Sequence, residues 1–166
     1  MKRLLLVLLL IGAPLAKGAD KSAATFYVQL VRGSDQDAPP APQARLIGPK
    51  LGHRLHDVFK WKNYWEIKRE TVTLKTGDKI RRRMSQQREV EIAWPSSREM
   101  TVSLYTDGKL TRKRQQSIDT AFYIAGGDKD VSECWFIIVR RDNPDAAEPG
   151  PGPGSTRPQP GLVSTN

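Results

Sequence analysis

Apolar residues that alternate with polar ones limit this chain to a β-rich fold more than any other feature of its sequence. Val90, Ile92 and Trp94 alternate with polar or small neighbours, and the segment 100–104 repeats the pattern. A period of two gives a strand one apolar face, which packs on a core while the other face meets water. The pattern therefore predicts antiparallel strands with one wet face.

Further segments combine this alternation with β-branched and aromatic residues between turn residues. They cover about residues 24–32, 65–74, 79–84, 110–116, 120–125 and 134–141. Residues 135–139 are apolar at both parities, so we expect a central strand that is covered on both faces. Asp107 and Gly108 are typical of a two-residue hairpin turn. We predict a mainly antiparallel β-sandwich, or a partly open barrel, of about seven or eight strands.

One of these segments changes its apolar phase. Trp65 and Ile67 share one parity, whereas Val72 and Leu74 share the other. A straight strand with a single buried face cannot accommodate such a change. We therefore expect a bulge or a break near residues 68–71.

A single segment has helical periodicity. Pro49 is tolerated in a first helical turn, and Leu51, Leu55, Val58 and Phe59 follow it at i, i+4, i+7 and i+8. This stripe predicts a short helix over about residues 49–60 that packs over one face or end of the β-structure.

The beginning of the chain has the pattern of a secretory signal peptide. Lys2 and Arg3 precede a short apolar run, and Ala16 and Gly18 mark a cleavage site after residue 18. The run is about half of the roughly 20 residues that a transmembrane helix needs. We therefore expect cleavage of residues 1–18, export to the periplasm or the cell exterior, and no integral membrane segment afterwards.

The other end of the chain is rich in proline and glycine. Residues 143–166 contain almost nothing to bury, so we expect a disordered tail with partial polyproline II character. Residues 19–142 then form a single β-rich globular domain of ordinary size. The formal charge of the full chain is +9, and the exported part stays basic without Lys2, Arg3 and Lys17.

Cys134 is the only cysteine, so no internal disulfide can support the fold in an oxidising compartment. Stability must come from an apolar core. The thiol begins a strongly apolar strand beside Glu133, an environment that raises a thiol pKa rather than lowering it. We interpret Cys134 as buried or inert.

Residue types that carry catalysis or bind metals are few. His53, His56 and Asp57 share the polar side of the predicted helix, but a catalytic zinc needs a third protein ligand and a base, and no second segment contains histidine. The chain also lacks a Gly-x-Ser-x-Gly nucleophile elbow. We therefore predict no catalytic residues, no metal site and no cofactor.

Basic residues on predicted strands are the main candidates for binding. They are Arg81, Arg83, Arg88, Lys109, Arg112 and Arg114. An outward face of this kind attracts polyanions such as lipid head groups or acidic glycans, and nucleic acid is not the partner that we expect. Charges on strands also keep sheet edges from pairing with other chains, and this second interpretation is the one we favour.

Aromatic residues gather just after the predicted helix. Trp61, Tyr64 and Trp65 offer a platform for a sugar, or a seam that joins the helix to the sheet. Because Phe59 lies beside them, we favour the seam.

Two segments resemble a group of uncharacterised exported bacterial β-domains. They are residues 50–65, with the run Val58-Phe59-Lys60-Trp61, and residues 126–141, with Gly126-Gly127-Asp128 leading to Trp135-Phe136-Ile137. The group has no assigned activity, so the resemblance implies a compartment and a fold but no mechanism.

These features favour an exported, non-enzymatic β-domain that binds or assembles in the cell envelope, with an envelope protein or a polyanion as partner. A polyanion- or carbohydrate-binding module is the alternative. A hydrolase is a second alternative, which requires His53 or His56 to lie near acidic residues from distant strands.

Overall fold

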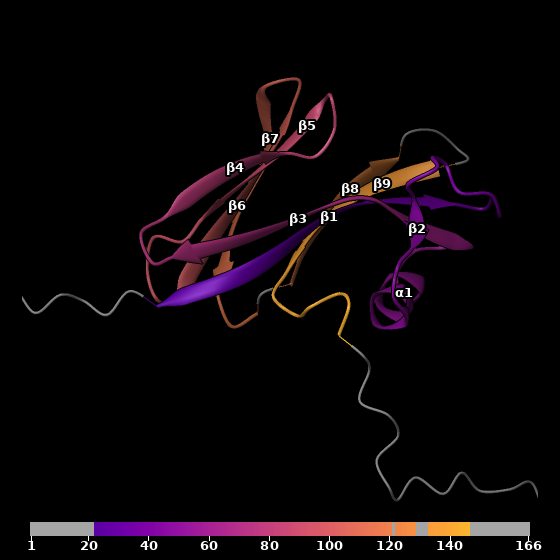
Figure 1. Ribbon diagram of the computed structural model, residues 1–166. Helices are drawn as coiled ribbons and strands as arrows, with labels where there is room; N and C mark the ends of the chain where they lie inside the picture. Colours follow the sequence, from indigo (N-terminus) through magenta and orange to yellow (C-terminus); the bar gives the residue numbers. More distant parts are fainter. Residues whose placement is uncertain (1–21, 121, 129–132, 147–166) are drawn as a thin grey trace, which may run out of the picture.

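The computed structural model describes residues 22–120, 122–128 and 133–146 (Figure 1). The predicted signal peptide and nearly all of the predicted tail lie outside these residues. The described part is mainly β, with two antiparallel sheets, one short helix and no closed barrel. The prediction of a β-sandwich is therefore confirmed.

Nine strands are described, of which one has only two residues. The five-stranded sheet has the order β2-β3-β1-β9-β8, with β1 at Ala23–Ser34, β2 at Arg45–Leu46, β3 at Asn63–Lys75, β8 at Phe122–Asp128 and β9 at Glu133–Arg140. The four-stranded sheet has the order β4-β5-β6-β7, with β4 at Lys79–Arg83, β5 at Arg88–Ala93, β6 at Glu99–Thr106 and β7 at Lys109–Ser117. All neighbouring strands are antiparallel.

The five-stranded sheet supports a separate apolar cluster on each of its faces. The interlayer cluster lies against the four-stranded sheet and includes Phe26 and Val28 of β1. The helix cluster lies on the opposite face, where Val31 of β1 packs with Leu51 and Leu55 of α1 (Pro49–His56). Figure 1 shows the four-stranded sheet over one half of the long strands and α1 beneath the other half. Strands β1 and β3 are therefore long because they serve two cores.

A bulge in β3 produces the predicted change of phase. Leu30 of β1 pairs with Lys68 and Val31 pairs with Glu66, so Ile67 is the extra residue. The bulge lies one residue before the segment in which we expected it. It lets Ile67 pack against the same interlayer cluster as Val72, despite their opposite parity.

The helix is shorter than its sequence pattern. It ends at His56, where the backbone N–H of Asp57 donates to the carbonyl of His53. The N–H of Phe59 donates to the carbonyl of Leu55, and this turn directs Phe59 towards the helix cluster. Val58 is 71% exposed, so its predicted place on the buried stripe was wrong.

The predicted hairpin turn is confirmed. Asp107 and Gly108 join β6 to β7 with φ angles of 50° and 75°, as a two-residue hairpin requires. The strand predicted over about residues 120–125 continues further, because Gly126 and Gly127 belong to β8 and pair with Phe136 and Trp135. A Cβ on Gly126 would lie 2.5 Å from the Phe136 ring. Glycine is therefore needed at this position of β8, because any side chain would collide with that ring.

A buried carboxylate links three strands on the helix side of the large sheet. Glu66 of β3 accepts hydrogen bonds from Gln29, Arg45 and Arg69. Beyond them, Arg69 donates to Asp145 at 2.5 Å, so contacts with the domain continue past the predicted boundary at residue 142. Burial raises the pKa of Glu66, but the hydrogen bonds outweigh it and leave this pKa below its ordinary value.

Glycine at position 33 is required by the helix cluster. A Cβ there would lie 2.7 Å from Sγ of Cys134 and 2.8 Å from the Trp61 ring. We expect Gly33→Ala to lower the free energy of unfolding by about 2 kcal/mol, because both neighbours are packed. Gly52→Ala is the matched control, since its Cβ meets nothing within 4 Å. In a helix this change should raise stability by about 0.5–1 kcal/mol. Urea denaturation measures both; equal effects would contradict the packing argument.

Glu66 should make the stability of the protein depend on pH. A carboxyl with a lowered folded pKa stabilises the protein above its unfolded pKa, and this contribution is lost as the pH falls through the folded value. At pH 7 we expect Glu66→Gln to cost about 3 kcal/mol, because it removes the buried carboxylate that Arg45 and Arg69 share and leaves Arg69 with Asp145 alone. Denaturation curves at pH 7 and at acidic pH should show the difference from wild type shrinking below about pH 4. A constant difference would show that the ionised form contributes nothing.

Candidate binding pocket at the end of the interlayer core

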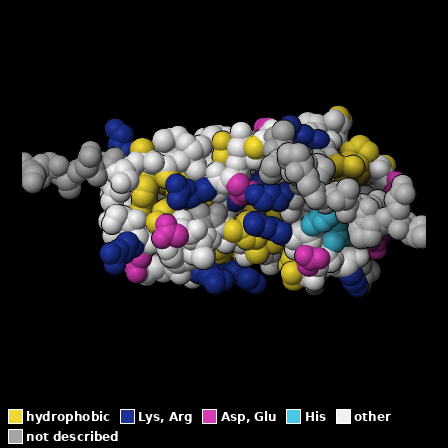
Figure 2. All heavy atoms as spheres, turned by 90° about the horizontal axis from the view of Figure 1, so that it is seen from below, with side chains coloured by type: hydrophobic (Ala, Val, Ile, Leu, Met, Phe, Trp, Pro, Cys, Tyr) yellow, Lys and Arg dark blue, Asp and Glu magenta, His cyan; other side chains and the backbone are white. Residues whose placement is uncertain are grey.

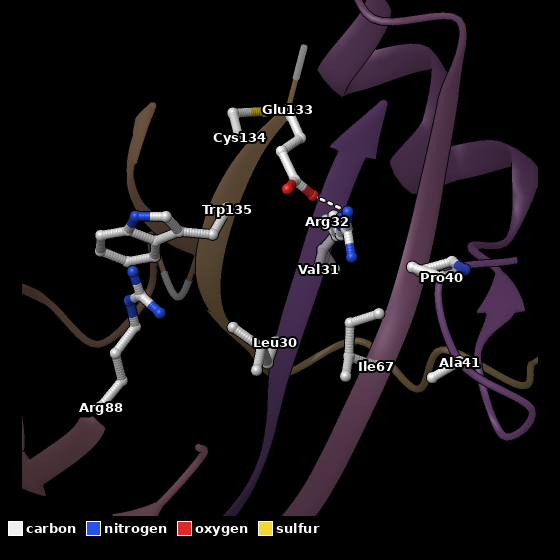
Figure 3. A pocket seen from close by; sticks show the side chains of 10 residues that line it. All are labelled: Leu30, Val31, Arg32, Pro40, Ala41, Ile67, Arg88, Glu133, Cys134 and Trp135. Carbon is white, nitrogen blue, oxygen red and sulfur yellow. Dashed lines mark ion pairs between the residues drawn. The ribbon is translucent and has the colours of Figure 1, made fainter. Parts of the chain in front are cut away.

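A pocket of about 190 Å³ opens where the interlayer cluster ends (Figure 3). It is called the arginine pocket here, after Arg32 and Arg88. Its other described lining residues are Leu30, Val31, Pro40, Ala41, Ile67, Glu133, Cys134 and Trp135. The long sheet supplies most of the wall, because β1 and β9 run on past the point where their apolar residues join the interlayer cluster.

The apolar wall follows from local structure. Leu30 is the last residue of β1 in the interlayer cluster, and Ile67 reaches it through the bulge of β3. Pro40 and Ala41 come from the proline-rich segment between β1 and β2. They lie at the right of Figure 3, across the pocket from Trp135. An aliphatic surface of this kind favours the apolar part of a ligand.

An ion pair spans the inner end of the pocket. Arg32 of β1 and Glu133 of β9 project from the same face of the sheet, since Arg32 is opposite Trp135 and Ser34 is opposite Glu133. Their side chains form a salt bridge, drawn as a dashed line in Figure 3. The Glu133 side chain is only 8% exposed, whereas the Arg32 side chain is 32% exposed, so the carboxylate lies largely out of water and the guanidinium does so only in part. Nε of Arg32 is buried and has no acceptor in the described part of the chain.

Arg88 enters the pocket from the other sheet. It is the first residue of β5 and shares the parity of Val90 and Ile92, both buried, so it points inward. Its guanidinium lies 4.0 Å from the centre of the Trp135 ring, a cation–π contact. Burial lowers the pKa of Arg88, and its Nε also lacks an acceptor among the described residues.

The chemistry of the arginine pocket is that of an anion site with an apolar wall. Among its described lining residues, two guanidiniums face one carboxylate, so the balance is positive. A buried N–H group without an acceptor keeps the full free-energy cost of its desolvation. A hydrogen bond to a charged acceptor offsets this cost more than one to a neutral acceptor. A carboxylate attached to a short apolar body fits both features.

The six basic residues predicted to form a surface do not share one face. Arg81 and Arg83 lie on the outer face of β4, where Glu89 pairs with both at 3.4 and 3.2 Å. Arg112 and Arg114 are opposite Leu104 and Val102, which places them on the inner face of the exposed strand β7. Arg88 lines the arginine pocket, and Lys109 begins β7 beside the hairpin turn.

The three predicted aromatic residues are all buried. Trp61 and Tyr64 belong to the helix cluster, and the hydroxyl of Tyr64 donates to the carbonyl of Phe59 at 3.0 Å. Burial raises the pKa of Tyr64 to about 12. Trp65 is opposite Arg32 and therefore lies on the other face of β3. With this burial, the three rings offer no common exposed surface to a sugar.

The histidines face a separate hollow beside the helix, and both side chains are exposed on the face of the molecule that Figure 2 shows, where they are cyan. His53 and His56 line a pocket of about 290 Å³ with Tyr64 and Lys62, and its described lining contains neither aspartate nor glutamate. The ring of His56 packs edge-on against Tyr64 at 4.9 Å. The described residues contain no group of three or more His, Cys, Asp or Glu that could hold a metal ion.

The sequence pattern did not identify Arg32, Glu133 and Trp135 as binding residues, although all three line the arginine pocket. Arg32 ends a predicted strand at the parity of Leu30, and this parity was the available signal that it faces inward. Glu133 and Trp135 belong to the β9 segment, where the apolar run indicated burial alone. Only the register of β1 with β9 reveals that Arg32 and Glu133 meet.

Comparisons with known proteins give no relatives. No protein-family model matches the sequence, and neither the curated proteins nor the solved structures contain a significant match. In residues 22–120, 122–128 and 133–146, no helix has the length and apolar character needed to cross a bilayer.

Arg88 should contribute little to folding. Its stacking on Trp135 is offset by the cost of burying an Nε donor without an acceptor. We expect Arg88→Leu to change the free energy of unfolding by less than about 1 kcal/mol, because leucine removes the donor and keeps an apolar contact with the ring. Guanidinium denaturation checks this value. A loss above about 2 kcal/mol would show that Arg88 is a structural residue.

Proposed function

We propose that this protein is an exported, non-enzymatic binding domain whose arginine pocket holds a small amphipathic anion, with a carboxylate as the charged group. The observation that carries the proposal is the pair of arginines, Arg32 and Arg88, whose buried Nε groups have no acceptor among the described residues. Two buried N–H donors without acceptors lower the stability of the folded protein. Local features that lower stability in this way are typical of binding sites.

The volume of the pocket limits the size of the ligand. Pockets for drug-sized molecules usually have about 300–1,000 Å³, and this one has about 190 Å³. A short acyl chain or a single side chain with a carboxylate is therefore a better match than an oligosaccharide. Leu30 and Ile67 would contact the apolar part, and Arg88 would receive the charge.

The proposed compartment is the periplasm or the cell exterior. It rests on the signal-peptide pattern of residues 1–18 and on the basic Lys2 and Arg3 before the apolar run.

Other functions have less support. A carbohydrate module needs exposed rings, but Trp61, Tyr64 and Trp65 are buried. A polyanion module needs a continuous basic face, and the six basic residues divide between two faces of one sheet. A hydrolase needs a histidine beside a carboxylate, and no acidic residue is among the described residues that line the His53 pocket.

Titration with sodium hexanoate tests the proposal. We expect hexanoate to bind with a dissociation constant of about 1 mM and to shift the NMR signals of Leu30, Arg32 and Trp135, because eight heavy atoms support only a modest affinity. Pentylamine has the same five-carbon alkyl chain with a positive head group and should not bind. Arg88→Leu should weaken hexanoate binding about tenfold.

The matched control for this variant is Arg98→Leu. Arg98 is exposed in the connection between β5 and β6, and it does not line the arginine pocket. Its replacement removes one positive charge and should leave the affinity unchanged. Equal weakening by the two variants, or signal changes outside the pocket, would refute the proposal.

A further inference from the structure

The two sheets end in edge strands that lie on the same side of the sandwich. β7 ends the four-stranded sheet and β8 ends the five-stranded sheet. Arg112 of β7 lines one hollow together with Ile124, Ala125, Gly126 and Gly127 of β8. In the described part of the chain, no strand pairs with the outer edge of either one.

The two edges differ in charge. β7 carries Lys109, Arg112, Lys113 and Arg114, and none of these forms an ion pair with a described residue. Charges of this kind prevent an edge from pairing with another chain. β8 has the sequence FYIAGGD, with Asp128 as its only charged residue. The edge of β8 therefore lacks the protection that β7 has.

The arginines of β7 face the unprotected edge. Arg112 and Arg114 share the inner face of β6 and β7 with the buried residues Leu104 and Val102, yet both arginines are exposed. Both lie close enough to Tyr123 of β8 to act on the pKa of its hydroxyl. They therefore present positive charge on one side of the β8 edge.

The hollow that Arg112 lines continues onto the helix face of the same edge. It has about 270 Å³ and is lined by Phe59, Trp61, Ile124 and Phe136. The rings of Phe59 and Phe136 are 4.6 Å apart. Gly126 and Gly127 of β8 also line the hollow.

We propose that the β8 edge binds an extended segment of a partner protein by strand addition, and that this segment alternates apolar and acidic residues. Successive side chains of an added strand point to opposite faces of the sheet. On the helix face they meet Phe59 and Phe136, and on the core face they meet Arg112 and Arg114. The backbone of β8 supplies hydrogen bonds, and the two faces select the sequence.

This hollow and the arginine pocket share the lining residue Cys134, but Arg32 and Arg88 line only the arginine pocket and Arg112 lines only the hollow at β8. Binding at β8 and binding of hexanoate can therefore be measured independently, and each can fail without the other.

The test uses the peptide acetyl-(Val-Glu)4-amide as the probe and the isotope-labelled full chain as the receptor. We expect it to bind with a dissociation constant below about 1 mM. It should also slow amide hydrogen exchange in residues 122–127, because strand addition protects backbone N–H groups. Acetyl-(Val-Lys)4-amide, which alternates in the same way with the opposite charge, should not bind. Exchange that is unchanged in β8, or equal binding of the two peptides, would overturn the proposal.

Two charge reversals on β7 distinguish binding at a specific site from attraction by the net charge of the protein. Arg112→Glu changes the inner face of β7 and should weaken the acidic peptide about fivefold. Lys113→Glu makes the same change of charge on the outer face, where Lys113 is opposite Ser103, and should leave the affinity within about twofold. Both residues are exposed, so the variants should fold. Equal weakening by the two reversals would show attraction by net charge and overturn the proposal.

Discussion

The pairing of β1 with β3 along their whole lengths is the constraint on which the rest of the structure depends. Each strand has one half under the four-stranded sheet and another half above α1. A single pair of strands thus joins two apolar clusters on opposite faces of one sheet. The bulge at Ile67 makes this arrangement compatible with the sequence, because it changes which parity of β3 faces the interlayer core. Tyr64, Val72 and Leu74 have the same parity in the sequence. In a strand without the bulge, burial of Tyr64 in the helix cluster would turn Val72 and Leu74 away from the interlayer core.

Charge inside this structure is organised by the same long sheet. Glu66 lies on the helix face within reach of Gln29, Arg45 and Arg69, and Asp145 extends the network to the end of the described chain. This carboxylate is almost fully satisfied, so it supports the fold. The arginine pocket on the opposite face differs, because its guanidiniums keep donors that no described residue accepts. The contrast between a satisfied and an unsatisfied cluster distinguishes a structural site from a candidate binding site.

The sequence contained most of the fold and little of the site. Local signals sufficed for the strands, for the Asp107-Gly108 turn and for Leu51 and Leu55 on the helix, since each depends on neighbours along the chain. The end of the helix was misjudged because Val58 and Phe59 both fit the helical period, whereas the turn after His56 leaves Val58 exposed and directs only Phe59 inward. The arginine pocket was missed because it depends on the register of β1 with β9 and on the place where the second sheet ends. Neither is visible in local periodicity.

Both candidate surfaces follow from the unequal size of the two sheets. A four-stranded sheet cannot cover every residue of a longer five-stranded one, so the inner face of the larger sheet remains open at one end and at one side. The open end exposes Arg32 beyond Leu30, and the open side places Arg112 and Arg114 beyond the edge of β8. A sandwich of equal sheets would bury these positions and would have to replace the arginines with apolar residues. The basic residues on the inner faces therefore mark the places where the core is incomplete, and those are the places where another molecule can complete it.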